Sequence, residues 1–460
     1  MEDQPSTITN ELLFEDVYFN TLRQTEFKRL DTNRQVYLDY TGGNIYAESL
    51  LLKHFEFLKQ SVCGNPHSSN PSSHLSTTLI EQARQRVLNF FNAEEYYCIF
   101  TGNTSEALRI VGESYPFSED SLFLYTIDNH NSVNGIREHC HNKKGKHKHV
   151  PVNFNDLCLD ETILDKNLRA YPEATNKLFA YPAQSNASGI KHDLSWVAKA
   201  KELGWDVLLD VAAFVPTNPL DLRKIQPDFL AVSFYKIFGY PTGIGCLLVH
   251  KSKFKKLEKH WFAGGTVSMV SISYPNYFLI GGHEKFENGT LNYLNLPALS
   301  MGFDFIDQIG MVRIQKRVAA LIGFLIKEMS ALQHDNGQNL CHIFGSKNLK
   351  HRGSNLIFSL LDKNGKSINL LHLEQQAGEA NISLRTGCFC NPGIDEVNFK
   401  VSEEDMAEYF CTRSEGDYND LTNFIGFFRG NTRVSVGIAT TKSDLDYFIN
   451  FLRRFLNAAV

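Results

Sequence analysis

The sequence lacks several features that would assign the chain to a special class of protein. It has no run of about 18 apolar residues and no basic segment followed by an apolar one near its start, so we expect neither a membrane span nor a secretory signal. The net charge is only −5, which gives no indication of a nucleic-acid or membrane partner. Internal repeats and low-complexity segments are also missing.

The cysteines form no disulfide or metal-binding pattern. There are 9 of them, an odd number scattered along 460 residues, which indicates reduced thiols in a cytoplasmic protein. Cys388 and Cys390 are close together, but no second pair has suitable spacing, so we expect no zinc site and no other metal site. Histidines and lysines are interleaved between residues 139 and 149, and we interpret them as a solvated loop in preference to a metal site.

Short apolar runs alternate with amphipathic stretches from about residue 80 to residue 250. The apolar runs predict strands at residues 97–100, 122–127, 178–181, 206–209, 229–232 and 245–249. The stretches between them predict helices, among them residues 79–90, 105–113 and 194–203. This alternation predicts an α/β fold with a mostly parallel sheet, covered by helices on both faces, that binds its ligand at the carboxyl ends of the strands.

The chain is long enough for more than one domain, and its pattern changes near residue 300. Residues 1–34 predict an amphipathic lead-in that packs on a small domain. Residues 35–300 predict a large domain that begins with a short strand at 35–40. Residues 301–460 predict the smaller α/β domain, with one long helix at 305–329, strands at 355–360 and 433–436, and a final helix at 442–455.

Four candidate ligand-binding groups follow predicted strands. Lys236 precedes a glycine-rich turn, and Asp210 ends an apolar run, where a buried carboxylate requires a positive partner such as a protonated pyridine nitrogen. Residues 101–106 open a helix whose N–H groups and hydroxyls suit a phosphate, and His130 is placed to stack on an aromatic ring. Taken alone, each group also has an ordinary explanation, as a solvated lysine, an exposed carboxylate, a helix N-cap or a structural histidine.

The segment 385–393, RTGCFCNPG, carries the second constellation. Two cysteines among glycines and a proline indicate a loop, from which a thiol can swing toward a substrate. Arg385 lies close enough in sequence to favour the thiolate, although small fillers beneath a loop remain the alternative. Arg433, near the start of a predicted strand, suits the carboxylate of an amino acid, unless it is simply solvated.

Together these segments resemble the class V aminotransferase branch of fold-type-I pyridoxal 5′-phosphate (PLP) enzymes. Within that branch they are similar to the cysteine-desulfurase-like domain of molybdenum cofactor sulfurases. The resemblance spans roughly residues 35–440 and is carried by YLDYTGGNIY, GNPHS, DNHNSVNGIRE, YPAQSNASG, SFYKIFGYPTGIG, FENGTLNYL and RTGCFCNPG. It implies that the large domain, residues 35–300, binds PLP and that the small domain, residues 301–460, carries the cysteine loop.

The resemblance also implies a role for individual residues. Lys236 would form the Schiff base with PLP, Asp210 would pair with the pyridine nitrogen and His130 would stack on the ring. Cys390 would carry the persulfide, with Cys388 as the alternative. The remaining implied roles are a hydrogen bond near the phenolic oxygen from Asn186, phosphate binding by Thr104, Ser105 and Ser233, phosphate binding across a homodimer interface by Thr290, and substrate-carboxylate binding by Arg433.

The activity implied is that of a PLP-dependent cysteine desulfurase. Sulfur from L-cysteine would pass to Cys390, alanine would be released, and a protein thiol or the molybdenum cofactor would accept the sulfur. Tyr235 and Ala213 differ from the His and Gln usual in ordinary cysteine desulfurases and resemble the sulfurase branch, which leaves the acid–base partner of Lys236 open. The alternatives are a PLP-dependent C–S lyase or aminotransferase and, in another class, a non-catalytic scaffold or sulfur carrier.

Overall fold

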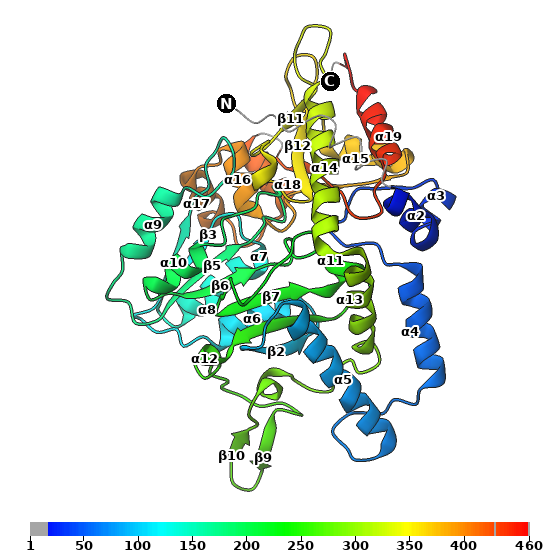
Figure 1. Ribbon diagram of the computed structural model, residues 1–460. Coiled ribbons are helices and arrows are strands. Elements are labelled where there is room, and N and C mark those ends of the chain that lie inside the picture. Colours follow the sequence, from blue (N-terminus) through cyan, green and yellow to red (C-terminus); the bar gives the residue numbers. More distant parts are fainter. Residues whose placement is uncertain (1–16, 427–428, 459–460) are drawn as a thin grey trace.

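Two larger sheets organise the protein, whose computed structural model describes residues 17–426 and 429–458 (Figure 1). The larger sheet has seven strands in the order β2-β8-β7-β6-β5-β3-β4. Their bounds are β2 Tyr96–Thr101, β3 Leu122–Thr126, β4 Lys146–Val150, β5 Lys177–Pro182, β6 Asp206–Asp210, β7 Phe229–Ser233 and β8 Gly245–His250. Strands β3 to β7 are mutually parallel, and β8 runs antiparallel to both β7 and β2. This arrangement confirms the predicted α/β fold with a mostly parallel sheet.

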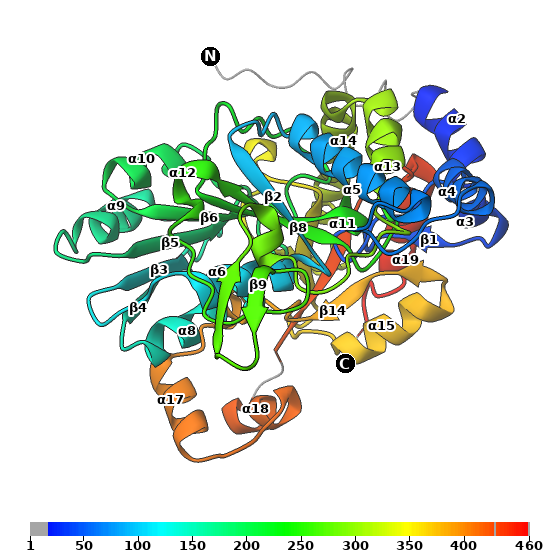
Figure 2. The same cartoon turned by 90° about the horizontal axis from the view of Figure 1, so that it is seen from below.

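Helices cover both faces of this sheet, because alternate side chains of a strand point to opposite faces. Leu208 of β6 packs in the core beneath α6 and α8, whereas its neighbours Val207 and Leu209 pack in the core on the other face. In Figure 2, α9 and α10 accordingly lie on one side of the strands and α6 and α8 on the other. The helices of this part are α4 Glu48–Gln60, α5 Pro71–Phe90, α6 Thr104–Ser114, α7 Asn131–Asn134, α8 Ile136–Asn142, α9 Glu161–Arg169, α10 Trp196–Glu202, α11 Phe234–Phe238, α12 Lys251–Phe254 and α13 Pro297–Ile309.

The smaller sheet is antiparallel and has four strands in the order β11-β12-β15-β14. These are β11 Cys341–Ile343, β12 Asn355–Leu360, β14 Arg385–Gly387 and β15 Asn431–Ser435. The predicted strands at 355–360 and 433–436 are therefore confirmed. The helices that accompany this sheet are α14 Met311–Ser330, α15 Leu370–Glu379, α16 Pro392–Phe399, α17 Glu403–Cys411, α18 Tyr418–Ile425 and α19 Lys442–Arg453.

The N-terminal segment lies against the C-terminal part of the chain. It contains α2 Val17–Glu26, α3 Arg29–Thr32 and β1 Val36–Tyr37, which pairs with β13 Ile382–Ser383. From α2, Arg23 donates to the carbonyl oxygen of Ala439 at 2.7 Å and pairs with Asp444. Residues 1–16 of the predicted lead-in lie outside the described residues, and the domain boundaries at 34 and 300 stay predictions.

Two predictions of local structure are wrong. The His- and Lys-rich segment predicted as a loop contains the end of α8 and most of β4, an edge strand whose side chains are mostly exposed, and only residues 143–145 lie between the two. Edge strands often carry lysine, so the polar composition concealed a strand. The long helix predicted at 305–329 is two helices, α13 and α14, which are separated by Gly310. Gly310 has φ 87°, a left-handed conformation that interrupts a helix and that glycine adopts readily.

The hairpin of β9 Val267–Ser271 and β10 Asn276–Leu279 projects from the large sheet at the bottom of Figure 1. Two 3₁₀ turns complete the fold, η1 His283–Phe286 and η2 Leu349–His351. Within the described part of the chain, no helix is both long and apolar enough to cross a membrane.

Candidate active site

A cavity of about 120 Å³ lies at the carboxyl ends of the central strands of the large sheet. The ends of β5, β6 and β7 meet the start of α6 there. The cavity brings together most of the predicted site residues, namely Thr104, Ser105, His130, Asn186, Asp210, Ser233 and Lys236. Residues scattered over more than a hundred positions therefore share one site, as the strand-end rule predicts.

Lys236 is placed by the short helix α11, which begins directly after β7. Burial lowers the pKa of the Lys236 amine, and the nearby Asp210 carboxylate partly opposes that shift. The helix ends at Gly239, whose φ is 82° and where an added Cβ would lie 2.4 Å from the backbone nitrogen of Tyr46. A buried amine with a lowered pKa is a competent nucleophile and a competent base.

Asp210 and His130 occupy fixed positions at the ends of β6 and β3. The Asp210 Oδ1 accepts a hydrogen bond from the backbone nitrogen of Ala212 at 2.9 Å. His130 accepts from the backbone nitrogen of Ser132 through Nδ1 at 3.1 Å, so this nitrogen carries no proton. Burial lowers the pKa of His130, which favours a neutral, flat imidazole facing the cavity. A carboxylate suits the protonated nitrogen at the edge of a pyridine ring, and a neutral aromatic ring suits its face.

The N-terminus of α6 supplies a corner suited to phosphate. Asn103 caps the helix by accepting from the backbone nitrogen of Glu106 at 3.0 Å, which leaves the first-turn hydroxyls available. Among the described residues, the buried hydroxyl of Thr104 has no hydrogen-bond partner. Ser105 contacts the hydroxyl of Ser132 at 2.6 Å, and the nearly buried Ser233 closes the corner at the end of β7. An unpartnered hydroxyl at a helix N-terminus fits a phosphate group, so this residue set fits PLP.

Arg433 lies beside the cavity and is held by a carboxylate that the sequence analysis did not single out. Its Nη2 donates to Asp39 Oδ1 at 2.9 Å, and its Nη1 donates to the carbonyl oxygen of Asn186 at 3.0 Å. Arg385 is its cross-strand neighbour in the β14–β15 pair and binds the other Asp39 oxygen at 2.8 Å. Asp39 therefore holds two guanidinium groups together and leaves one net positive charge for a substrate carboxylate.

The two cysteines of the loop between β14 and α16 differ in environment. Cys390 is exposed, whereas Cys388 is only partly exposed. Burial raises the pKa of the Cys388 thiol, which disfavours the reactive thiolate. These differences favour Cys390 over Cys388. The predicted partner of the thiolate, Arg385, instead shares its charge with Asp39.

Comparison with known proteins assigns the chain to a family. The family model for aminotransferase class-V matches residues 36–448. The chain belongs to the class V aminotransferase family. This membership confirms the predicted family and the predicted class of PLP-dependent enzyme.

Curated relatives of this class V chain include molybdenum cofactor sulfurases. The human protein is 36% identical over 465 residues, which cover 94% of this chain and 50% of that protein. The Arabidopsis thaliana protein is 35% identical over 479 residues, which cover 94% of this chain and 57% of that protein. The chain thus spans about half the length of the curated relatives it matches.

Solved structures share the fold of this class V chain. The apo structure of a cysteine desulfurase from Thermococcus onnurineus gives a TM-score of 0.79 at 22% identity and covers 95% of this chain and 98% of that chain. The cysteine desulfurase CsdA from Escherichia coli gives a TM-score of 0.75 at 20% identity and covers 96% of this chain and 99% of that chain. These likenesses confirm the predicted fold type.

Thr290 does not line the cavity at the carboxyl ends of the central strands of its own chain. It is exposed and follows the hairpin, where Gly289 donates to the carbonyl oxygen of Gly264 at 2.9 Å. It lines a separate hollow together with Gly102 and Glu106. The predicted role of Thr290 at a neighbouring subunit's phosphate stays a prediction.

Three residues at the site were missed, although each lies inside a quoted phrase. Asp39 belongs to YLDYTGG and Asn391 to RTGCFCNPG. Gln184, in YPAQSNASG, lines the cavity and donates to Asn355 at 3.1 Å, while its Oε1 finds no partner among the described residues. A buried polar residue within a site phrase was the available signal, because such a residue needs a partner.

Proposed function

We propose that the chain is a cysteine desulfurase that uses PLP and transfers sulfur from L-cysteine to Cys390. One observation carries the proposal: a single site joins the buried Lys236 amine to an exposed thiol and a carboxylate-binding arginine. The ring of Phe389, next to Cys390 in the chain, lies 4.8 Å from the Arg433 guanidinium carbon. An arginine that holds an amino acid beside a thiol suits sulfur abstraction, and an aminotransferase has no use for that thiol.

The acceptor of the sulfur belongs to the same proposal. The molybdenum cofactor is supported by the relatives named molybdenum cofactor sulfurase, which are similar over 94% of this chain. A protein thiol is the alternative acceptor. Either acceptor would take the sulfur from Cys390, which is exposed and therefore open to an acceptor that approaches from outside.

The residues would divide the chemistry as follows. PLP, when bound, supplies an electron sink for the charge that develops at the substrate Cα. Asp210, His130, Thr104, Ser105 and Ser233 would hold the cofactor. Arg433 would orient the substrate carboxylate, and the Lys236 amine, whose pKa burial lowers, would remove the Cα proton.

Cys390 performs the sulfur step. Its thiolate attacks the substrate sulfur and forms an S–S bond. The Cβ–S bond of the substrate breaks, and its electron pair stays with carbon. Protonation of that carbon and the return of a proton to Cα complete alanine, and Cys390 keeps the sulfur as a persulfide.

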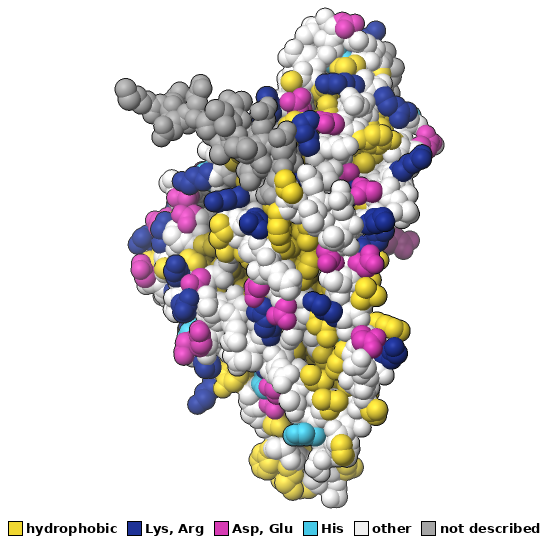
Figure 3. Space-filling model, turned by 45° about the vertical axis from the view of Figure 1, so that its right-hand side comes forward, with side chains coloured by type: hydrophobic (Ala, Val, Ile, Leu, Met, Phe, Trp, Pro, Cys, Tyr) yellow, Lys and Arg dark blue, Asp and Glu magenta, His cyan; other side chains and the backbone are white. Residues whose placement is uncertain are grey.

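Exposed apolar side chains support a homodimer within this proposal. The hydrophobic atoms at the lower end of Figure 3 belong to the region of the projecting hairpin. The exposed apolar residues of this hairpin and of α4 include Met269, Ile272, Tyr274, Phe278, Leu52, Phe55 and Leu58. Extended apolar surfaces of this kind mark protein interfaces. Thr290 follows the same hairpin and is exposed, so it would be available to a partner subunit packed there.

Cys390→Ala, compared with its matched control Cys388→Ala, tests the function. Both proteins should show the visible absorption band of lysine-bound PLP. Alanine formation from L-cysteine should fall by about 100-fold or more in Cys390→Ala only, because the nucleophile is missing.

Product analysis separates the outcomes of that test. A Cys390→Ala protein that makes alanine at the full rate contradicts the assigned nucleophile. Pyruvate with ammonia indicates a C–S lyase, and a requirement for an oxo acid indicates an aminotransferase. A wild-type protein that cannot be loaded with PLP indicates a scaffold or sulfur carrier.

A further inference from the structure

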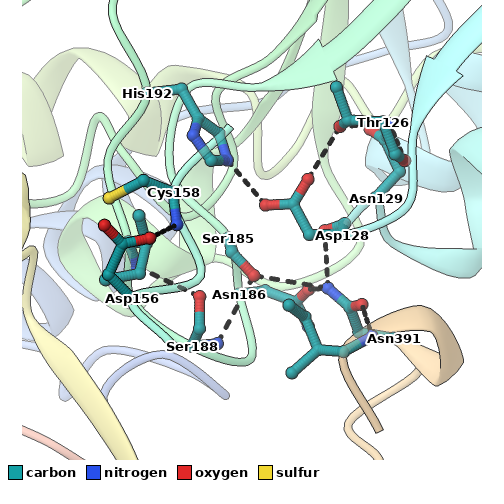
Figure 4. Close-up of polar contacts among 12 residues, drawn as sticks. Thr126, Asp128, Asn129, Asp156, Cys158, Ser185, Asn186, Ser188, His192 and Asn391 are labelled. Atoms are coloured by element: carbon teal, nitrogen blue, oxygen red, sulfur yellow. Dashed lines mark hydrogen bonds and ion pairs between the residues drawn. The ribbon is translucent and has the colours of Figure 1, made fainter. Parts of the chain in front are cut away.

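The loop that carries Cys390 is fastened to the large sheet by the side chain of Asn391. This side chain is fully buried. Its Nδ2 donates to the carbonyl oxygen of Asp128 at 2.7 Å and to Oδ1 of Asn186 at 3.0 Å, and its Oδ1 accepts from the backbone nitrogen of Ile394 at 3.3 Å (Figure 4). One amide therefore joins the cysteine loop to the ends of two parallel strands, β3 and β5.

Further hydrogen bonds fix the two residues that precede Asn391. The backbone nitrogen of Asn131 donates to the carbonyl oxygen of Cys390 at 2.8 Å. Asn186 uses its Nδ2 to donate to the carbonyl oxygen of Phe389 at 2.8 Å. Asn131 follows His130 directly, so the cysteine loop is attached to the same segment that faces the cavity. These bonds argue against the predicted swinging of the loop.

The anchor point itself is rigid. The carboxylate of Asp128 accepts from the hydroxyl of Thr126 at 2.7 Å and lies 2.6 Å from Nε2 of His192 (Figure 4). All three side chains are buried. A buried carboxylate bound on both oxygens holds its own backbone in place, and that backbone supplies the carbonyl to which Asn391 donates.

The backbone at Cys390 needs this support. Phe389 and Cys390 have φ 57° and 54°, so two consecutive non-glycine residues adopt the left-handed conformation. Such residues persist only where the surrounding structure holds them. The start of α16 adds a second contact, because an added Cβ at Gly393 would lie 2.0 Å from the carbonyl oxygen of Ile127.

We infer that Asn391 is a positioning residue for the sulfur step, and that it holds Cys390 in its strained conformation so that the thiol stays beside the substrate. This inference rests on the proposed function of Cys390. Because the loop is fastened, the acceptor comes to the persulfide, and the persulfide does not travel on a moving loop. Asn391 performs this role through Nδ2, which donates to the two oxygen acceptors on Asp128 and Asn186.

Asn391→Asp in the PLP-loaded protein separates positioning from helix capping. Aspartate keeps the volume and the cap to Ile394, and it is as good an N-cap as asparagine. It replaces the Nδ2 donor by an oxygen that faces the carbonyl of Asp128 and the Oδ1 of Asn186. A thiol displaced by about 1 Å is expected to slow persulfide formation on Cys390 about 100-fold. Asn391→Ala, which removes the donor without burying a charge, gives a second reading should the aspartate variant fail to fold.

The readouts are persulfide on Cys390 in a single turnover, measured by mass spectrometry, and the change in the PLP absorption band on binding L-cysteine. Both Asn391 variants should bind L-cysteine within about threefold of the wild type and lose the persulfide step. Asn167→Ala, a buried asparagine of α9 that donates to Ile163, is the matched control and should keep both readouts.

The possible results of this experiment have different consequences for Asn391 and for Cys390. An Asn391→Asp protein with the wild-type persulfide rate overturns the inference, since it reduces Asn391 to a helix cap. Loss of L-cysteine binding in parallel with the persulfide step also overturns it, since it indicates general damage to the site. A Cys390→Ala protein with normal alanine formation overturns the proposed function. If Cys390→Ala loses the persulfide step and the Asn391 variants keep it, only the role of Asn391 is overturned.

Discussion

Arg433→Lys should weaken the binding of L-cysteine far more than it slows turnover. In the structure the Arg433 guanidinium donates to Asp39 and to the carbonyl oxygen of Asn186. Its buried Nε has no partner among the described residues and remains free for a substrate carboxylate. A lysine ammonium is a single point of charge and lacks the planar fork that contacts all three groups together.

The structure allows the magnitude to be worked out. A hydrogen bond to a charged group contributes about 1.5–3 kcal/mol. Loss of one such bond to the substrate carboxylate, at about 2–3 kcal/mol, raises KM by about 30- to 160-fold. The carboxylate takes no part in bond breaking, so the interaction is the same in the ground state and the transition state, and kcat should stay within about threefold.

Steady-state alanine formation from L-cysteine measures both constants. Arg23→Lys is the matched control, because Arg23 is 4% exposed, Arg433 is 3% exposed, and both pair with aspartate. The control is expected to lose stability and to keep the wild-type KM. A KM for Arg433→Lys within about threefold of the wild type would refute the assignment, as would a fall in kcat at unchanged KM.

Three other predictions follow from buried groups. Burial lowers the pKa of Lys236 from 10.5, so below 10.5 the unfolded chain binds more protons and the PLP-free protein loses stability as the pH falls toward the lowered pKa. Lys236→Met should therefore raise the melting temperature of the PLP-free protein at pH 7, with a gain that shrinks as the pH rises toward 10.5; a gain that does not change with pH contradicts this. Glu287→Ala removes the buried carboxylate 2.6 Å from Arg84 and leaves that guanidinium with only the half-exposed Glu81 as an ionic partner, so it should cost about 3 kcal/mol of unfolding free energy in urea titration, whereas a loss under about 1 kcal/mol contradicts it. Gly393→Ala should push the start of α16 from Ile127 and slow persulfide formation while PLP stays bound; an unchanged rate argues against the contact.

The strands of the large sheet could be predicted because most of them are buried on both faces. Strands β3, β6 and β7 are buried at every position, and each contains a run of at least three apolar residues. Strand β4 escaped prediction because it lies at the edge, where its Lys and His side chains face solvent. The spatial order of the strands was beyond reach, because pairing depends on contacts between distant segments. Similarly, helical periodicity runs through Gly310, and only the backbone angle shows the break.

The cofactor side of the site was more predictable than the substrate side for a related reason. Apart from Thr290, the residues assigned to PLP follow strands of one mostly parallel sheet, so the strand-end rule gathers them without knowledge of any contact. Asp39 and Arg433 are 394 residues apart, and the bridge of residue 39 to Ser435 of β15 places the two side chains together. Periodicity and turn signals describe neighbours along the chain and carry no information on such a pair.

This difference in construction predicts which functions can be separated. The groups of this chain assigned to PLP depend on strands β2, β3, β5, β6 and β7 of the large sheet, whereas Arg433 depends on β15 and the Cys390 loop on β14 of the small sheet. Asn391 and Asn186 form one of the hydrogen-bonded links between the two. Changes in Arg433 or Asn391 should therefore alter substrate binding or sulfur transfer while PLP stays bound. Asn186 is different: it lines the cavity, and its backbone carbonyl and side-chain amide hold Arg433 and the cysteine loop, so its loss should affect all three functions together.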